Sequence, residues 1–182
     1  MFKITSSAED ADLERTLAER RYERIALTSV QTASLARMSF ETDAAVTIST
    51  TLGEPWFADF NRLTVTPESL QPSERRLLEK IAFPHAFGST AVDSETAAVG
   101  LAVHERGHVG LFDVVVDYQH RNQGLARRVC QALLAWAHHE GAHTAYLAVM
   151  ADNAPAVHLY NRLGFREVYQ YWYRHTPDDF AA

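Results

Sequence analysis

The sequence has little of several features that define other protein classes. Cys130 is the only cysteine among 182 residues, so a disulfide within the chain is excluded and we expect a buried small residue in a helix. No apolar run is long enough to cross a membrane, and the residues after Met1 lack the apolar stretch of a signal peptide, which predicts a cytoplasmic protein. The net charge is −6 with dispersed arginines, so the basic face that nucleic-acid binding requires is missing.

A metal site and a second large domain are also disfavoured. Nine histidines occur, but His138, His139 and His143 fall at a predicted helix end and loop, where the helix dipole and water suit them without any ligand geometry. The sequence therefore predicts no bound metal. With 182 residues, 47% of them hydrophobic, the chain can bury one core, as one domain or as one domain with an appendage.

What the sequence does contain is a strand, a glycine turn and a helix in succession. The strand-like run is Leu111–Val116, the turn is Arg121–Ala126 and the helix-like run is Leu125–His139. The first turn of a helix carries unpaired N–H groups and the positive end of the helix dipole, so it favours phosphate. Gly124 lets the backbone approach a ligand closely. An ordinary strand-to-helix connection explains the glycine equally well, so this motif alone leaves both interpretations open.

A second motif follows the apolar run Ala145–Val149 and predicts a short helix. Asn153 is a good N-cap, Pro155 is tolerated in a first turn, and Gly164 is typical of a left-handed helix end. Tyr160 falls on the apolar face of this helix. By itself that position predicts core packing for the tyrosine.

Together the two motifs resemble the signature of the GNAT superfamily of acyl-coenzyme A dependent N-acyltransferases, R/Q-x-x-G-x-G/A followed by N-x-x-A-x-x-x-Y-x-x-x-G-F. Both halves match in order, from Arg121 and from Asn153. The resemblance is strong from His108 to Arg174 and weaker back to Ala44. It implies an α/β (α+β) fold with a central mixed, mostly antiparallel sheet flanked by helices, and it implies acetyl-CoA as co-substrate.

The resemblance also implies a donor site. In the family the coenzyme A pyrophosphate lies on backbone amides of the glycine turn, and the preceding strand contacts pantetheine through main-chain groups, as an added strand would. The valines of that strand can at the same time be core residues, because backbone contacts leave their side chains free to pack. The residues implied for the donor are Val114, Val115, Val116, Arg121, Asn122, Gln123, Gly124, Leu125, Ala126, Arg127, Asn153 and Tyr160.

By the same resemblance Tyr160 is the general acid that protonates the departing thiolate, and Asn153 lies near the acyl donor. A free thiol has a pKa of about 8.5 and tyrosine one of about 10, so this transfer needs no large tuning. The family has no universal base for the amine. Asp113, on the strand that reaches the site, is our candidate, with a solvated aspartate and an ordered water as alternatives. Further candidates for the base are His85, His104 and Glu95.

Upstream of the motifs the pattern predicts the order β-α-α-β-β. The elements expected are strand 45–51, helices 55–63 and 67–81, and a hairpin of strands 96–104 and 108–116 around Glu105-Arg106-Gly107. Thr66 and Pro67 suit the start of the second helix, and Pro72 kinks or restarts it.

This part builds the acceptor pocket in a GNAT domain. The resemblance therefore implies acceptor contacts from Trp56, Phe57 and the Phe83-Pro84-His85 loop. Core packing explains the aromatic residues equally well.

The first 42 residues are extra to a minimal domain, which we place at residues 43–182. Ile4–Gln31 aligns without gaps on Leu147–Arg174, with a cap near Asp10 and Arg21-Tyr22 over Gly164-Phe165, and this suggests the remnant of a degenerate first GNAT copy or a coincidence. A remnant without a glycine cradle would not bind coenzyme A. Its strands would pair with the main sheet or with another subunit, which predicts a homodimer.

The leading function is therefore acetyl transfer from acetyl-CoA to a primary amine of a small molecule or protein, by direct attack of the bound amine. The acidic balance of the chain fits a cationic amine. A catalytically silent acyl-CoA binding module is the alternative. A dinucleotide-binding oxidoreductase is disfavoured, because the glycine turn follows an antiparallel hairpin and no G-x-G-x-x-G occurs.

Overall fold

The strands of this chain form one mixed sheet, and the computed structural model describes residues 1–6, 11–40 and 43–176. Within these residues eight strands are hydrogen-bonded in the order β1-β8-β2-β7-β6-β5-β4-β3. β6 and β7 pair in parallel, whereas the pairs β1–β8, β2–β8, β3–β4, β4–β5 and β5–β6 are antiparallel. The predicted α/β class with a mixed, mostly antiparallel sheet flanked by helices is confirmed. In the described part of the chain no helix combines the length and apolarity that a membrane span requires.

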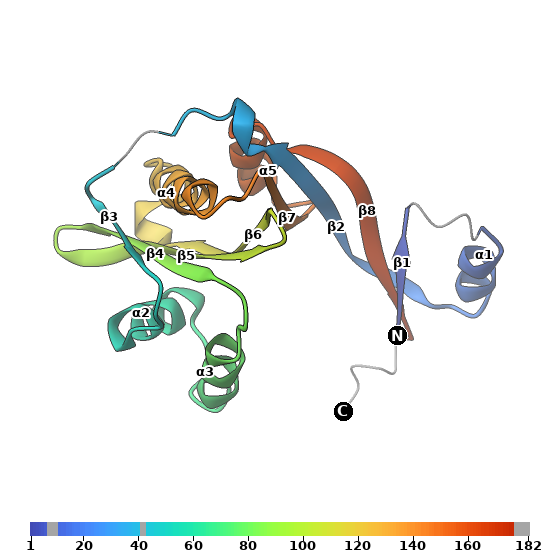
Figure 1. Ribbon diagram of the computed structural model, residues 1–182. Coiled ribbons are helices and arrows are strands. Elements are labelled where there is room, and N and C mark those ends of the chain that lie inside the picture. The colour runs from blue at the N-terminus through green and yellow to red at the C-terminus, as the bar shows by residue number, and fades with distance from the viewer. Residues whose placement is uncertain (7–10, 41–42, 177–182) are drawn as a thin grey trace. The chain divides into compact units, whose positions relative to one another are not determined.

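Two units share the strands, and each is described by itself. One unit is Ser34–Tyr146, and the other combines Met1–Ala33 with Leu147–Ala182. The elements of the first are η1 (Leu35–Arg37), β3 (Val46–Ser49), α2 (Glu54–Thr64), α3 (Gln71–Glu79), β4 (His85–Val92), β5 (Glu95–Glu105), β6 (His108–Val116), η2 (Tyr118–His120), α4 (Leu125–His139) and the start of β7 (Thr144–Met150). In Figure 1, α4 covers one face of this unit's strands, and α2 and α3 lie on the other.

The face toward α4 is built from small residues. Gly88 of β4 lies directly opposite Gly100 of β5. A Cβ on Gly100 would lie 3.0 Å from Val129 Cγ1 and 3.1 Å from Leu133 Cδ1, so the two glycines allow α4 to pack close to the strands. Because side chains alternate along a strand, the residues next to these glycines in sequence face α2 and α3.

The face toward α2 and α3 is aromatic. The hydrophobic cluster there consists of buried residues from four elements, Trp56, Phe57, Phe60, Leu78, Phe87, Val99 and Leu101. Trp56 stacks on Phe60, and its indole N–H donates to the carbonyl of Gly88 at 2.9 Å. Trp56 and Phe57 are only 7% and 6% exposed, which supports the core-packing interpretation of both residues.

Several elements match their predictions, and two differ. α4 has the predicted bounds, and β5 and β6 turn through Arg106 and Gly107 with φ of 50° and 78°. Residues 85–92 form strand β4, which the predicted order β-α-α-β-β left out. The second helix begins at Gln71, with Pro72 in its first turn, and not at Pro67. Pro72 therefore starts this helix, because proline lacks the N–H that a helix interior needs.

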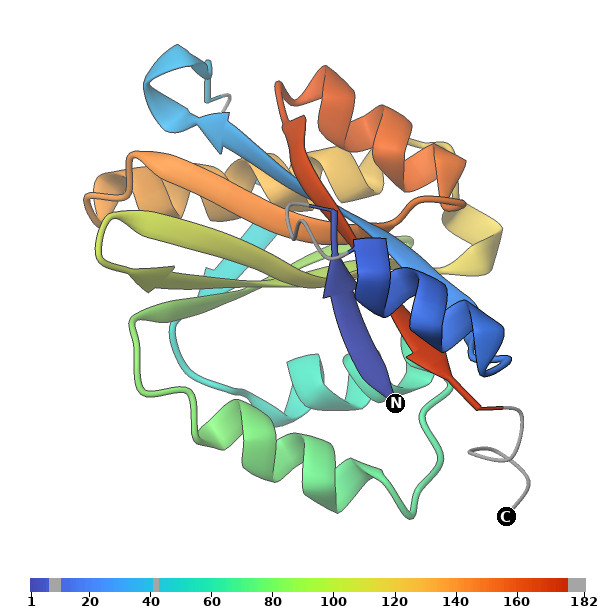
Figure 2. The ribbon, with the colours of Figure 1, turned by 90° about the vertical axis from the view of Figure 1, so that its right-hand side faces the viewer.

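The second unit has a strand-helix-strand at each end of the chain (Figure 2). Its elements are β1 (Phe2–Thr5), α1 (Ala11–Glu19), β2 (Glu23–Ser34), the end of β7, α5 (Ala154–Arg162) and β8 (Arg166–His175). β1 and β2 both pair with β8 in antiparallel fashion. The strands of the N-terminal segment thus pair within the chain. They do not need strands of a second subunit as partners, and a homodimer stays a prediction.

The elements of the two segments of this unit correspond at a constant shift in residue number. A shift of 143 positions, which carries Ile4 to Leu147, carries α1 onto α5 and the first residue of β2 onto the first residue of β8. The same shift maps the pair Glu23–His175 onto the observed pair Thr32–Arg166, and it maps the pair Thr28–Tyr171 onto itself. The antiparallel β2–β8 pair therefore has a local two-fold relationship.

The helix ends repeat as well. Tyr22 N donates to Leu17 O at 2.9 Å, and Phe165 N donates to Tyr160 O at 3.0 Å. The residue before each donor has a positive φ, 61° at Arg21 and 92° at Gly164. The predicted placement of Arg21-Tyr22 over Gly164-Phe165 is confirmed, whereas the predicted cap near Asp10 lies outside the described residues.

Candidate functional site

The glycine turn forms a helix start with no side-chain cap. Gly124 is the N-cap of α4, with φ 79° and ψ 3°, and no side chain at this position accepts a hydrogen bond from the first-turn amides. Asn122 also has a positive φ of 62°. A Cβ added to Gly124 would meet no described atom within 4 Å, so the backbone at this position faces open space. A left-handed turn that leads into an uncapped 15-residue helix is an arrangement that favours an anion.

Charged and buried groups around this turn have distinct positions. Arg121 lies over the ring of Tyr118, with 5.0 Å between the guanidinium carbon and the ring centroid. Leu125 is buried and anchors the first turn of α4 in the core. Arg128, one turn into the helix, pairs with Asp43 through two hydrogen bonds, and these lower the pKa of Asp43. Exposed Arg121 and Arg127 are thus the cations at the turn itself.

The strand before the turn offers main-chain groups on its second edge. Asp117 N donates to Ala97 O at 2.8 Å, and Val116 lies opposite Ala98 on β5. Because hydrogen-bonded and non-hydrogen-bonded pairs alternate in an antiparallel ladder, the amide and carbonyl of Val116 point away from β5. The same alternation turns those of Val115 toward β5. Val116 therefore presents its backbone to that edge.

Asp113 lies at a bulge in β6. The β5–β6 register shifts between Val99 and Leu101, and Asp113 has φ 51°, so its side chain leaves the regular alternation of the strand. Its surface is exposed, yet enough protein surrounds the carboxylate for desolvation to raise its pKa. The negative charge of Glu74 on α3 raises the pKa of Asp113 further. Glu74 Oε2 is itself buried and accepts no hydrogen bond within the described part of the chain.

The other candidate bases are placed differently. Glu95 forms an ion pair with Arg62 at 3.5 Å, and Nδ1 of His85 lies 2.8 Å from Phe83 O. Nε2 of His104 is buried without a hydrogen-bond partner among the described residues. Asp113 combines an exposed surface with a raised pKa.

Asn153 and Tyr160 belong to the second unit, and both predicted local roles hold. Asn153 caps α5 through its side-chain oxygen, which accepts from Ala156 N at 3.2 Å. Tyr160 is 8% exposed and packs edge-on against Phe165, with ring centroids 5.9 Å apart. Cys130 is fully buried, which raises its pKa to about 12, and the predicted packing role for it is confirmed.

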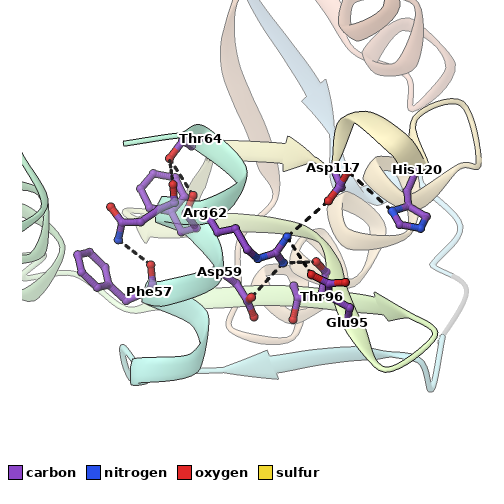
Figure 3. A network of polar contacts seen from close by, with 10 residues as sticks. Phe57, Asp59, Arg62, Thr64, Glu95, Thr96, Asp117 and His120 are labelled. Atoms are coloured by element: carbon purple, nitrogen blue, oxygen red, sulfur yellow. Dashed lines mark hydrogen bonds and ion pairs between the residues drawn. The ribbon is translucent and has the colours of Figure 1, made fainter. Parts of the chain in front are cut away.

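A polar cluster beside the turn was missed by the sequence interpretation (Figure 3). Arg62, in the last turn of α2, donates to Thr96 O at 2.6 Å and to Asp59 Oδ1 at 3.0 Å. It also lies 3.5 Å from Asp117 Oδ2 and from Glu95 Oε1. We call these five residues the Arg62 cluster. The one local signal for it is Asp117, an aspartate directly before a three-residue turn, where a capping carboxylate is common.

Comparisons with known proteins agree with this geometry. A family model described as "Probable histone acetyltransferase Rv0428c C-terminal" matches residues 13–174. The chain belongs to this family. Membership confirms the resemblance to the GNAT superfamily, and the family is one of acetyltransferases.

Two curated relatives illustrate the range of similarity. The "Uncharacterized N-acetyltransferase YobR" of Bacillus subtilis is 25% identical over 173 residues, which is 93% of this chain and 70% of that protein. The "[Ribosomal protein bS18]-alanine N-acetyltransferase" of Escherichia coli is 40% identical over 57 residues, 31% of this chain and 38% of that protein.

Solved structures confirm the fold. A GCN5-related N-acetyltransferase from Sphaerobacter thermophilus gives a TM-score of 0.74 at 16% identity, covering 96% of this chain and 60% of that one. A tandem GNAT protein from the clavulanic acid biosynthesis pathway, solved without AcCoA, gives 0.71 at 17% identity, covering 97% and 64%. The chain thus spans less than two thirds of either structure.

Proposed function

We propose that this chain transfers an acetyl group from acetyl-CoA to a primary amine of a small molecule or protein. The observation that carries the proposal is the uncapped start of α4, where Gly124 in a left-handed conformation faces open space. Such a turn suits a pyrophosphate, which needs close backbone amides and positive potential. Family membership over residues 13–174 supports the same activity.

In this proposal each part of the donor is held by residues that the GNAT resemblance implies. The amides of residues 122–127 and the guanidinium groups of Arg121 and Arg127 would hold the pyrophosphate. The main-chain groups of Val116, turned away from β5, would pair with pantetheine amides, with Val114 and Val115 beside them. Asn153 would lie near the acyl end. Bound there, acetyl-CoA would supply an activated acyl thioester.

Proton transfers would fall to two side chains. Asp113 would accept the proton that the ammonium group must lose before its nitrogen can attack, and its raised pKa makes it a stronger base than an ordinary aspartate. Tyr160 would give its phenolic proton to the departing thiolate sulfur and recover one from solvent. The two carboxylates of Asp113 and Glu74 would favour a cationic amine over a neutral acceptor.

Calorimetric titration with acetyl-CoA tests the donor site. Gly124→Glu adds bulk and negative charge to the turn, and Gly141→Glu is its matched control. Gly141 lies just after the same helix, has φ 92° and also has no described atom within 4 Å of an added Cβ. We expect micromolar binding by the wild type and by Gly141→Glu, and its loss in Gly124→Glu. No binding by the wild type would remove acetyl transfer as the function.

We further infer that residues 1–42 are the remnant of a degenerate GNAT copy that precedes an active domain at 43–182. The repeated strand-helix-strand and its repeated helix end support this inference. The segment has no glycine cradle, so we expect it to bind no coenzyme A. A homodimer stays a prediction that sedimentation equilibrium would check.

A further inference from the structure

The segment just before the glycine turn is held by a residue that the proposed chemistry does not use. We propose that Arg62 is a positioning residue for the donor site, which fixes the turn by holding Asp117. The inference rests on the proposed function. It is carried by the geometry of the Arg62 cluster (Figure 3).

Asp117 is the point at which β6 ends and the approach to the turn begins. Its amide closes the β5–β6 ladder by donating to Ala97 O at 2.8 Å. Its Oδ1 accepts from Gln119 N at 2.8 Å and lies 3.9 Å from His120 Nδ1. The residue that follows His120 is Arg121, the first of the donor turn. One carboxylate therefore shapes the whole of η2.

Arg62 holds this carboxylate from the opposite face of the sheet. α2 ends at Thr64 and lies on the face away from α4, whose first turn is the proposed donor site (Figure 1). Arg62 spans the strand ends by bonding the Thr96 carbonyl at the start of β5 and Asp117 just beyond β6. Without its cation, the carboxylates of Asp59, Glu95 and Asp117 would lose the guanidinium group that they share.

Loss of Arg62 should displace η2 more than it lowers the free energy of unfolding. Arg62 is 37% exposed in its side chain and Glu95 is 73% exposed, and ion pairs at such exposure contribute little to folding. A small displacement of η2 would nevertheless move Arg121 and the amides after it. Sites that bind through several fixed donors lose affinity when their supporting contacts loosen.

The decisive comparison is Arg62→Met against Arg75→Met. Methionine keeps much of the Arg62 stem and removes its charge. Arg75 lies on α3, bonds Glu54 of α2 at 2.8 and 2.7 Å and stacks on Phe57 of α2, so its loss perturbs the packing of α2 without touching Asp117. We expect Arg62→Met to raise the Kd for acetyl-CoA about tenfold, as for one lost charge-assisted hydrogen bond. Arg75→Met should leave that Kd unchanged.

Two further readouts separate positioning from a general structural role. In ligand-free protein, amides in residues 118–127 should exchange faster in Arg62→Met than in the wild type, while those of β4 and β5 should not. Arg62→Met/Asp117→Asn should recover part of the affinity, because asparagine keeps the cap on Gln119 N without the unpaired charge.

The possible results distinguish failure of this inference from failure of the proposed function. Equal Kd and equal exchange in Arg62→Met and the wild type would overturn the inference while the proposed function stands. Equal losses in Arg62→Met and Arg75→Met would also overturn it, since the effect would then be one of helix packing. A wild type that binds no acetyl-CoA would refute the proposed function and the inference with it.

Discussion

Leu17 and Tyr160 occupy equivalent positions in two copies of one local structure. They lie 143 positions apart. The carbonyl oxygen of each accepts a hydrogen bond from the amide five positions later, from Tyr22 N at 2.9 Å and from Phe165 N at 3.0 Å. Both side chains are buried, at 4% and 8% exposure. Leu17 is therefore buried at the end of α1 as Tyr160 is at the end of α5. Because leucine has no hydroxyl group, α1 lacks the proton donor that we propose for α5.

The two helix ends make a matched test of this equivalence. Arg21 has φ 61° and Gly164 has φ 92°, in the region where residues with a Cβ are strained. Arg21→Gly should raise the free energy of unfolding by about 0.5–1 kcal/mol, and Gly164→Ala should lower it by about 1 kcal/mol. Urea denaturation measures both. A loss of stability in Arg21→Gly would show that α1 does not end in a left-handed residue at position 21.

Glu14 anchors α1 to β8. Glu14 accepts from Trp172 Nε1 at 2.5 Å and from Arg174 Nη2 at 2.6 Å. Glu14→Ala removes the carboxylate partner of half-buried Arg174, which keeps its bond to Tyr22 O, and should destabilise by about 1–3 kcal/mol. Arg15→Ala is the control, because Arg15 is 68% exposed, and it should change stability by less than about 0.5 kcal/mol. Equal effects in the two variants would contradict the anchoring role.

Gly100 sets how closely α4 approaches the strands. An added methyl group would lie 3.0 Å from Val129 Cγ1, so Gly100→Ala should destabilise by about 1–3 kcal/mol through overpacking. Val129→Ala in the same chain makes room for that methyl group. We therefore expect the double variant to be more stable than the sum of the single effects predicts, as measured by thermal unfolding. Strict additivity would mean that the two side chains do not compete for space.

The pH dependence of transfer reports on Asp113. Desolvation and then the charge of Glu74 raise its pKa, so the carboxylate becomes protonated at a higher pH than an ordinary aspartate. We expect kcat/KM to fall as the pH is lowered through this raised pKa. Glu74→Gln removes the repelling charge and should move that fall to lower pH. An unshifted profile would assign the proton transfer to another group.

Unfolding gives an independent check on the same group. Since the folded state disfavours the charged form of Asp113, its ionisation destabilises the fold as the pH rises above the ordinary aspartate value. Asp113→Asn should therefore stabilise the protein near neutral pH and have no such effect in acid below that value. Stabilisation that persists in acid would have a different cause.

The sequence predicts the local structure of the glycine turn, α4 and α5 well because these features are local. Their caps, glycines and apolar positions fall within a few residues of one another, and the structure places α4 and the α5 caps as expected. β4 was missed because its centre contains Gly88 and Ser89, and glycine is depleted in strands. The close approach of α4 explains Gly88, and only the folded chain shows that approach.

The polar contacts of the site could not be predicted in the same way. The Arg62–Asp117 bond joins residues 55 positions apart, and no periodic pattern links them. The charge of Glu74 reaches Asp113 from another element. Such pairs depend on how helices pack on strands, and local propensity carries no information about that.

Acetyl transfer itself is the most direct test of the account. The purified chain would be incubated with acetyl-CoA and a panel of primary amines, with free thiol and acetylated product measured for the wild type and for Tyr160→Phe, which keeps the ring packed on Phe165. We predict transfer to at least one amine by the wild type, and a kcat at least about a hundredfold lower in Tyr160→Phe with an unchanged Kd for acetyl-CoA. A wild type that binds acetyl-CoA and acetylates no amine would contradict the account and indicate a catalytically silent acyl-CoA binding module.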